Sequence, residues 1–349
     1  MNLRRALLAI AIAVSLTAQF SHAAQSAKAG PPPVSLPQGF SPVSAARQTA
    51  QMGRGINIIG YDPIWDDFSQ ARFQERHFQR IREGGFRTLR VNLQAFSHMD
   101  GSNQLDVVWL STLDWVISQA LANKLTVIVD EHDFTLCAED LAGCRPRLLA
   151  FWEQVAQRYK DTPNQVLFEI QNEPNGQLTP EAWNGLMAEA LAIIRKTNPT
   201  RNVIIGPAFW NDINSLKDLR LPESDRHVIV TIHYYLPMRF THQGASWVKE
   251  FASLSGVTWG SAEDKRRVDE DFARAAAWSA QKHRPIFLGE FGAYDKGEME
   301  YRVRYDSYVA RKAESHGWAW SYWQFDSDFL AYDMANDDWV KPIHKALVP

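Results

Sequence analysis

The sequence predicts a single (β/α)8 barrel, a parallel sheet of eight strands closed on itself. From residue 51 onward, short β-branched runs alternate with longer amphipathic stretches, and about 300 residues suffice for one such barrel. No internal repeat and no second core pattern divides this stretch. The main alternative is a doubly wound sheet, but its phosphate-binding fingerprint G-x-G-x-x-G follows none of the candidate strands.

Two groups of residue ranges make up this pattern. The predicted strands are residues 55–59, 88–93, 125–129, 166–170, 203–205, 228–232, 285–288 and 317–322. The predicted helices between them are residues 70–83, 107–123, 147–159, 180–197, 264–283 and 300–316, with a short one at 211–219.

The sequence of the N-terminal segment predicts that the protein is exported from the cytoplasm. Residues 1–23 resemble a signal peptide, because Arg4 and Arg5 precede an apolar run at 6–18 that is too short to span a membrane. Residues 24–50 contain Pro31–Pro33 and no apolar periodicity, so we predict a flexible lead-in, followed by the barrel domain at 51–349. We expect a mature protein that is periplasmic or secreted, not bound to membrane, and monomeric.

The amino-acid composition limits the classes of molecule that the protein is expected to bind. The 349 residues are 45% hydrophobic, 12% aromatic and 22% charged, as in ordinary globular proteins. The net charge of −3 offers no basic excess for nucleic acid, whereas 13 tryptophans supply flat apolar platforms that stack on sugars. Cys137 and Cys144 have six residues between them, and we expect them to form a disulfide in an oxidising compartment rather than a metal site, since no further ligands flank them.

Polar side chains gather where the predicted strands end. In a (β/α)8 barrel, active residues come from the carboxyl ends of several strands. Arg90, His132, Glu173, His233 and Glu290 each fall there, with one parity relative to their own strands, so we expect all five to point into the mouth of the barrel.

These residues resemble the motifs of glycoside hydrolase family 5, over the stretch from Met52 to Asp326. Asn172-Glu173-Pro174 and Gly289-Glu290-Phe291-Gly292 are the most specific matches. All eight recurring positions of the family have a counterpart, namely Arg90, His132, Asn172, Glu173, His233, Tyr235, Glu290 and Trp323. The resemblance implies a barrel whose acid/base and nucleophile lie on the fourth and seventh strands.

The resemblance also implies roles. Glu173 is expected to be the acid/base and Glu290 the nucleophile, held ionised by Arg90 and Tyr235. Asn172 is expected to bind the 2-hydroxyl of the reacting sugar, and Trp323 to lie beneath that sugar. His132 and His233 are expected to donate hydrogen bonds to hydroxyls and carboxylates. We place Trp210 and Trp247 in the cleft, and assign Glu169 and Gln171 a structural role.

The predicted function is that of a secreted, retaining endo-β-1,4-glucanase acting on β-glucan polysaccharides or oligosaccharides. No cofactor and no metal is expected, because the early His-x-His of barrel metallohydrolases is missing. A mannanase, xyloglucanase, mixed-linkage glucanase, exo-glucosidase or transglycosylase of the same family remains an alternative. So does a non-catalytic glycan-binding barrel, although both carboxylates are present.

Overall fold

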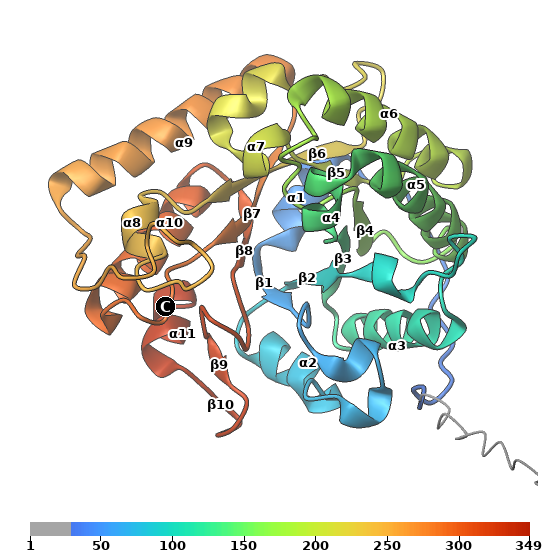
Figure 1. Ribbon diagram of the computed structural model, residues 1–349, viewed down its shortest axis with the longest axis horizontal. Helices are drawn as coiled ribbons and strands as arrows, with labels where there is room; N and C mark the ends of the chain where they lie inside the picture. Colours follow the sequence, from blue (N-terminus) through green and yellow to red (C-terminus); the bar gives the residue numbers. More distant parts are fainter. Residues whose placement is uncertain (1–28) are drawn as a thin grey trace, which may run out of the picture.

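The computed structural model describes residues 29–349, which form a closed barrel of eight parallel strands in the order β1 to β8. Figure 1 shows the strands at the centre and the helices around them, so the predicted fold class is confirmed. The strands are β1 (Arg54–Ile58), β2 (Thr88–Leu93), β3 (Thr126–Glu131), β4 (Val166–Glu169), β5 (Val203–Ile205), β6 (Val228–Tyr234), β7 (Ile286–Phe291) and β8 (Ala319–Tyr322). The predicted signal peptide lies outside the described residues.

Six long helices cover the barrel where amphipathic stretches predicted them. They are α2 (Glu75–Glu83), α3 (Val107–Ala122), α5 (Leu141–Arg158), α6 (Pro180–Thr197), α9 (Ala262–Lys282) and α10 (Met299–Ser315). Shorter elements are α4 (Phe134–Glu139), α7 (Ala208–Asn211), η4 (Ile213–Asp218), α8 (Met238–Thr241), α11 (Lys341–Leu347) and the hairpin β9 (Tyr332–Asp333) with β10 (Asp338–Trp339). Within residues 29–349, no helix has both the length and the apolar character needed to cross a bilayer.

The start of α5 differs from the prediction. The helix begins at Leu141 instead of 147 and contains Pro146. Pro146 is the sixth residue of the helix, so its missing N–H leaves one backbone hydrogen bond unmade, yet the helix continues through it and the proline does not mark a boundary here. The side chain of Asp140 caps the helix by accepting from the N–H of Gly143. The predicted disulfide is present: Cys137 in α4 and Cys144 in α5 are bridged, with 4.9 Å between their Cα atoms.

The segment before β1 corrects the prediction of a flexible lead-in. Its last part forms α1 (Ala45–Met52), which contacts β6 and β8 and covers one end of the barrel. Inward side chains of six strands meet this helix in a small apolar layer: Ala45, Met52, Ile128, Leu167, Ile204, Ile229, Phe287 and Ala319. Upstream, Leu36 packs on the core and Phe40 lies against the guanidinium of Arg201. The segment shows no apolar periodicity because two of the four buried residues of α1, Gln48 and Thr49, are polar, and single side chains make the upstream contacts.

Candidate active site

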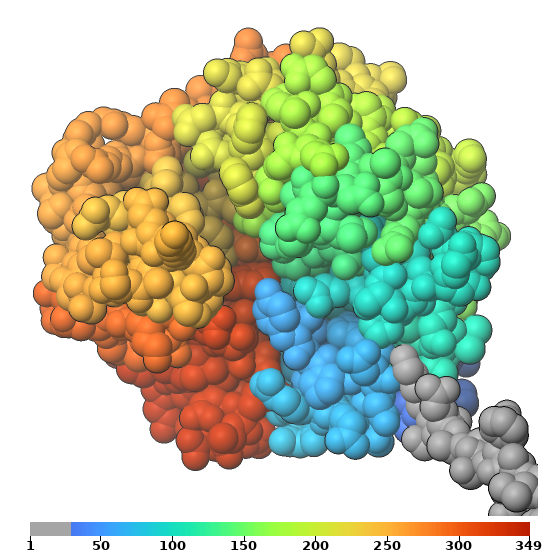
Figure 2. Space-filling model, viewed as in Figure 1, coloured from blue at the N-terminus to red at the C-terminus, as the bar shows by residue number. Residues whose placement is uncertain are grey.

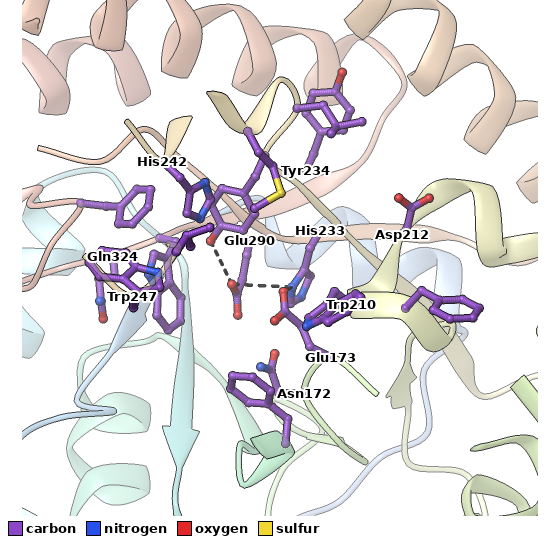
Figure 3. A pocket seen from close by; sticks show the side chains of 18 of the residues that line it. Asn172, Glu173, Trp210, Asp212, His233, Tyr234, His242, Trp247, Glu290 and Gln324 are labelled. Carbon is purple, nitrogen blue, oxygen red and sulfur yellow. Dashed lines mark hydrogen bonds and ion pairs between the residues drawn. The ribbon is translucent and has the colours of Figure 1, made fainter. Parts of the chain in front are cut away.

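A cleft of about 570 Å³ lies over the carboxyl ends of the strands. Figure 2 shows the molecule hollowed between the orange segment that follows β6 and the green segments that follow β3 and β4. Trp210 and Trp247, predicted to line this cleft, do so with 54% and 52% of their surface exposed. Figure 3 shows them on opposite sides of the two glutamates.

Three of the predicted residues point into the barrel, and two of them, His132 and His233, line the cleft. Ile128 and Ile229 lie in the inner apolar layer of β3 and β6. Stepping along each strand two residues at a time leads to His132 and His233, which therefore also point inward. Arg90 of β2 is completely buried inside the barrel. The parity prediction is confirmed for these side chains.

The side chains of Glu290 and Glu173 point into the cleft because of backbone irregularities, not because of regular strand alternation. In β7, Phe287 belongs to the inner layer, so strict alternation would turn Glu290 outward. The pairing of β6 with β7 slips between Ile232 and His233 and leaves Gly289 unpaired, a bulge that re-aims Glu290 into the barrel. A Cβ on Gly289 would lie 2.9 Å from His233 Nε2, so this position has no room for a side chain.

Beyond the end of β4, the backbone is also irregular. Glu169 faces inward to Arg90, whereas Gln171 turns to Glu131 and donates to its carboxyl at 2.9 Å. Asn172 and Glu173 are neighbours in sequence, and both line the cleft. Glu173 has φ of 42°, a left-handed conformation that is costly for a residue with a side chain. The predicted common parity of Glu173 and Glu290 was therefore wrong, although both reach the mouth of the barrel.

Arg90 organises the floor of the site. Its guanidinium donates to Glu290 at 2.7 Å, to Glu169 at 2.8 and 2.9 Å, and to Asn172 at 2.8 Å. Asp130 lies 3.1 Å from the same group. One fixed positive charge thus faces three buried carboxyl groups. Glu169 serves to hold Arg90, in agreement with the structural role predicted for it.

Glu290 has the environment of an ionised carboxylate. Arg90 contacts one oxygen, and the hydroxyl of Tyr235 donates to the other at 2.9 Å. Burial raises the pKa of Glu290, and the charge of Arg90 opposes that rise. Both oxygens of this buried group therefore have donors, as the prediction from Arg90 and Tyr235 required.

Glu173 has the environment of a protonated acid. Its nearest polar partner is His233, whose Nδ1 lies 2.8 Å from Glu173 Oε1. Burial raises the pKa of Glu173 to about 7. An oxygen of Glu173 and an oxygen of Glu290 lie within 4.8 Å of each other. Figure 3 shows His233 beside both carboxyl groups, and its Nδ1 lies 3.6 Å from Glu290 Oε2.

His132 and Trp323 together form part of the wall of the cleft. The ring of His132 stacks on Trp323 with 6° between the planes and 5.6 Å between the centroids. Its Nδ1 lies 2.7 Å from Asp130, and the Asn172 amide lies 3.3 Å from its Nε2. Burial lowers the pKa of His132 to about 4, so the ring is neutral near pH 7. The structure thus brings all eight motif residues together.

Several cleft residues were missed by sequence reasoning. Seven of them come from loops and short helices without a local pattern: Tyr61, Phe134, Phe209, His242, Gln324, Asp328 and Phe329. Asn211, also missed, is buried behind His233. The only signal in the sequence was that aromatic residues follow the strands, a signal that does not separate wall residues from core residues. Tyr61 and Phe209 are the most exposed of these aromatics.

A metal-binding arrangement is the geometric alternative for this cluster. Glu173, His233 and Glu290 each offer one atom within 4.8 Å of the others. However, Arg90 lies 2.7 Å from Glu290, and His233 bridges toward Glu173 at 2.8 Å. A guanidinium in contact with the cluster disfavours a cation and fits a pair of carboxyl groups in different protonation states.

Comparisons with known proteins agree with this geometry. A family model described as Cellulase (glycosyl hydrolase family 5) matches residues 49–328. Endoglucanase H of Acetivibrio thermocellus is 30% identical over 315 residues, covering 86% of this chain and 33% of that protein. Endoglucanase A of Clostridium longisporum is 28% identical over 264 residues, covering 70% of this chain and 49% of that protein. This chain therefore spans half or less of the length of these two relatives.

Solved structures match this chain over their own full length. Endoglucanase Cel5A from the hyperthermophilic Thermotoga maritima has a TM-score of 0.84 and 38% identity, covering 88% of this chain and 100% of that chain. Structures of Thermotoga maritima Cel5A are known in complex with mannotriose and with cellobiose. The similarity extends over almost the whole of the described barrel.

Proposed function

This chain belongs to glycosyl hydrolase family 5, and we propose that it cleaves internal bonds of β-1,4-glucan chains with retention of anomeric configuration. The carboxyl pair carries the proposal. Glu290 is held by Arg90 and Tyr235, Glu173 has its pKa raised to about 7, and their nearest oxygens lie within 4.8 Å. Retaining glycosidases separate their carboxyl groups by about 5–5.5 Å, whereas inverting ones need roughly 6.5–9.5 Å to admit a water.

The first step forms a covalent bond to the enzyme. An oxygen of Glu290 attacks the anomeric carbon while the bond from that carbon to the leaving oxygen breaks. The proton of Glu173 passes to the leaving oxygen, because a sugar alkoxide is a poor leaving group. The products of this step are a glycosyl ester on Glu290, a free chain end and an ionised Glu173.

The second step reverses the roles. With Glu290 esterified, its negative charge is gone, and Glu173 now accepts a proton from water as that water attacks the anomeric carbon. The ester bond breaks, Glu290 leaves as a carboxylate, and Glu173 is again protonated. Two inversions at one carbon return the β configuration.

The walls of the cleft supply the binding energy. Asn172 lies beside both carboxyl groups, where its amide reaches the 2-hydroxyl of the reacting sugar, and Trp323 provides a flat surface against His132. Trp210 and Trp247 lie on opposite sides of the glutamates and remain half exposed. Stacking platforms on both sides of the reacting bond favour a chain that continues in both directions, which is the requirement for internal cleavage.

A substrate panel tests this function. We expect the viscosity of carboxymethylcellulose to fall much faster than reducing ends appear, and the first-formed sugar to be the β-anomer by proton NMR. Mannan, xyloglucan and mixed-linkage glucan belong in the panel, since a Thermotoga maritima relative has been solved with both mannotriose and cellobiose. Activity confined to mannan, glucose as the sole early product, or an α-anomer would contradict the proposal.

We also propose that the chain is exported to the periplasm or secreted. The predicted signal peptide at 1–23 motivates this, and the Cys137–Cys144 disulfide supports it, because disulfides persist mainly in oxidising compartments. Mass measurement of the protein recovered outside the cytoplasm should show loss of about residues 1–23 and no free thiol. Recovery of the intact chain in the cytoplasm with two alkylatable thiols would contradict it.

A further inference from the structure

A buried amide lies behind the histidine that contacts the acid/base. Asn211, at the end of α7, is completely buried, and its Nδ2 lies 3.2 Å from His233 Nε2. The other ring nitrogen of His233 lies 2.8 Å from Glu173 Oε1. One imidazole ring therefore connects Asn211 to the carboxyl group proposed to transfer the proton.

The backbone holds Asn211 in this place at an energetic cost. Phe209, Trp210 and Asn211 have φ of 58°, 58° and 56°, three consecutive left-handed residues that carry side chains. Each such residue costs roughly 1 kcal/mol or more. A Cβ on Gly206 would lie 1.9 Å from Asn211 Oδ1, so only glycine leaves room for the amide. The same turn presents Trp210 to the cleft.

The hydrogen bond to His233 is the polar contact that this placement provides. Among the described residues, Asn211 Oδ1 is buried without a hydrogen-bond partner. An unsatisfied buried oxygen is unfavourable, typically by about 1–3 kcal/mol. Asn211 thus combines two unfavourable features, a left-handed backbone and an unsatisfied buried oxygen. The contact that accompanies both is the one between its amide nitrogen and His233.

The direction of this hydrogen bond sets the tautomer of His233. Burial lowers the pKa of His233 to about 4, so near pH 7 its ring carries a single proton. An amide N–H of Asn211 can only donate, which requires a lone pair on Nε2 and places the proton on Nδ1. The ionisable groups that act on the ring, from the strands around it, are Arg90, His132, Glu169, Glu173 and Glu290. Of these, Glu173 is within hydrogen-bond distance, and it faces Nδ1.

We propose that Asn211 is a positioning residue that fixes the Nδ1–H tautomer of His233 and thereby keeps the acid proton of Glu173 on Oε2. This rests on the proposed function. Because Oε1 accepts from His233 Nδ1–H, the proton of neutral Glu173 resides on the other oxygen, from which it passes to the leaving oxygen of the sugar. In the second step the same N–H stabilises the Glu173 carboxylate, so the tautomer serves both steps.

The variant Asn211→Asp tests this relation with almost no change of shape. A carboxylate beside Nε2 accepts, and it draws the ring proton to Nε2. If the ring stays neutral, His233 Nδ1 becomes an acceptor and holds the Glu173 proton on Oε1. If the ring becomes an imidazolium, its positive charge lowers the pKa of Glu173. In both cases the leaving oxygen loses its proton donor.

Two substrates with different leaving groups separate this effect from misfolding. Cellotetraose needs protonation of its leaving oxygen, whereas 2,4-dinitrophenyl β-cellobioside has a leaving group that departs without it. For Asn211→Asp we expect kcat/KM to fall about 100-fold or more on cellotetraose and by less than about 3-fold on the aryl substrate. The ratio of the two values does not depend on the fraction of folded enzyme. A pH profile shifted toward acid on cellotetraose is the second expected result.

The matched control is Asn214→Asp. Asn214 is exposed in the adjoining η4 at the edge of the same cleft, and its Oδ1 accepts from Arg274 at 3.4 Å, a contact that aspartate also makes. This variant adds the same charge without touching His233, and we expect it to keep the ratio of the parent. Equal losses on both substrates for Asn211→Asp, or an unchanged ratio, would overturn the proposal while the parent remains an active glucanase. An inactive parent would overturn the proposed function itself.

Discussion

Gly289 is the position at which one methyl group should damage catalysis most selectively. A Cβ there would lie 2.5 Å from Thr231 Oγ1 and 2.9 Å from His233 Nε2, both well inside van der Waals contact. Overpacking of this kind costs typically about 1–3 kcal/mol. At roughly 2–4 °C per kcal/mol for a large domain, we expect Gly289→Ala to lower the melting temperature by about 2–12 °C.

The loss of activity should exceed what this destabilisation explains. His233 contacts Glu173 at 2.8 Å and lies 3.6 Å from Glu290, so displacing its ring misplaces a donor for both carboxyl groups. We expect kcat on cellotetraose to fall about 100-fold at temperatures where the variant is fully folded, since displacements near 1 Å can cost that much. The measurement pairs kcat with a thermal unfolding curve of the same preparation.

A double variant separates the two clashes. Thr231→Ala removes the oxygen at 2.5 Å, and Thr231 Oγ1 has no hydrogen-bond partner among the described residues, so little is lost with it. Combined with Gly289→Ala, it should restore most of the melting temperature but not kcat. The control Gly185→Ala, in an exposed turn of α6 with no atom within 4 Å of the new Cβ, should raise stability by up to about 1 kcal/mol. Recovery of kcat in the double variant would refute the reasoning.

Three further results are expected. Because the general acid must be protonated and burial raises the pKa of Glu173 to about 7, kcat/KM should fall as the pH rises above about 7, and a plateau extending to pH 9 would contradict this. Replacing Cys137 and Cys144 by serine opens a short loop and should lower the free energy of unfolding by about 2–3 kcal/mol in urea titrations; an unchanged midpoint would contradict it. Trp210→Ala and Trp247→Ala each remove a half-exposed platform worth roughly 1–2 kcal/mol, so KM for cello-oligosaccharides should rise about 5- to 30-fold, and a fall in kcat at constant KM would contradict this role.

The fold was predictable because the barrel strands are buried on both faces. Runs such as Val203–Ile205 and Val228–Tyr234 contain β-branched residues at successive positions, a pattern that predicts interior strands of a parallel sheet. Helix ends were less predictable where side-chain caps override a proline, as at Asp140 and Pro146. The helix α1 was missed because it is only eight residues long and two of its four buried residues, Gln48 and Thr49, are polar, so it has no apolar stripe.

The site was predictable by motif and not by alternation. Regular strand alternation points His132 and His233 into the cleft. The orientation of Glu290 depends instead on the bulge at Gly289, and that of Glu173 on a left-handed backbone. Neither irregularity has a reliable sequence signature, since glycine and glutamate occur in many conformations. Asn211 escaped prediction because its importance lies in a contact with His233, on the neighbouring strand β6.

The closure of the barrel also bears on the order in which the chain can fold. One edge of β1 pairs with β2, but its other edge pairs with β8, and α1 contacts β6 and β8, so the earliest elements of the described chain complete their contacts only near its end. The closing contacts therefore join residues far apart in sequence, and a loop over most of the polypeptide must close before they form. A chain that emerges from a ribosome with its N-terminus first would keep Met52 and one edge of β1 uncovered until β8 is released. Apolar surface and an unpaired strand edge exposed in this way favour aggregation during that interval.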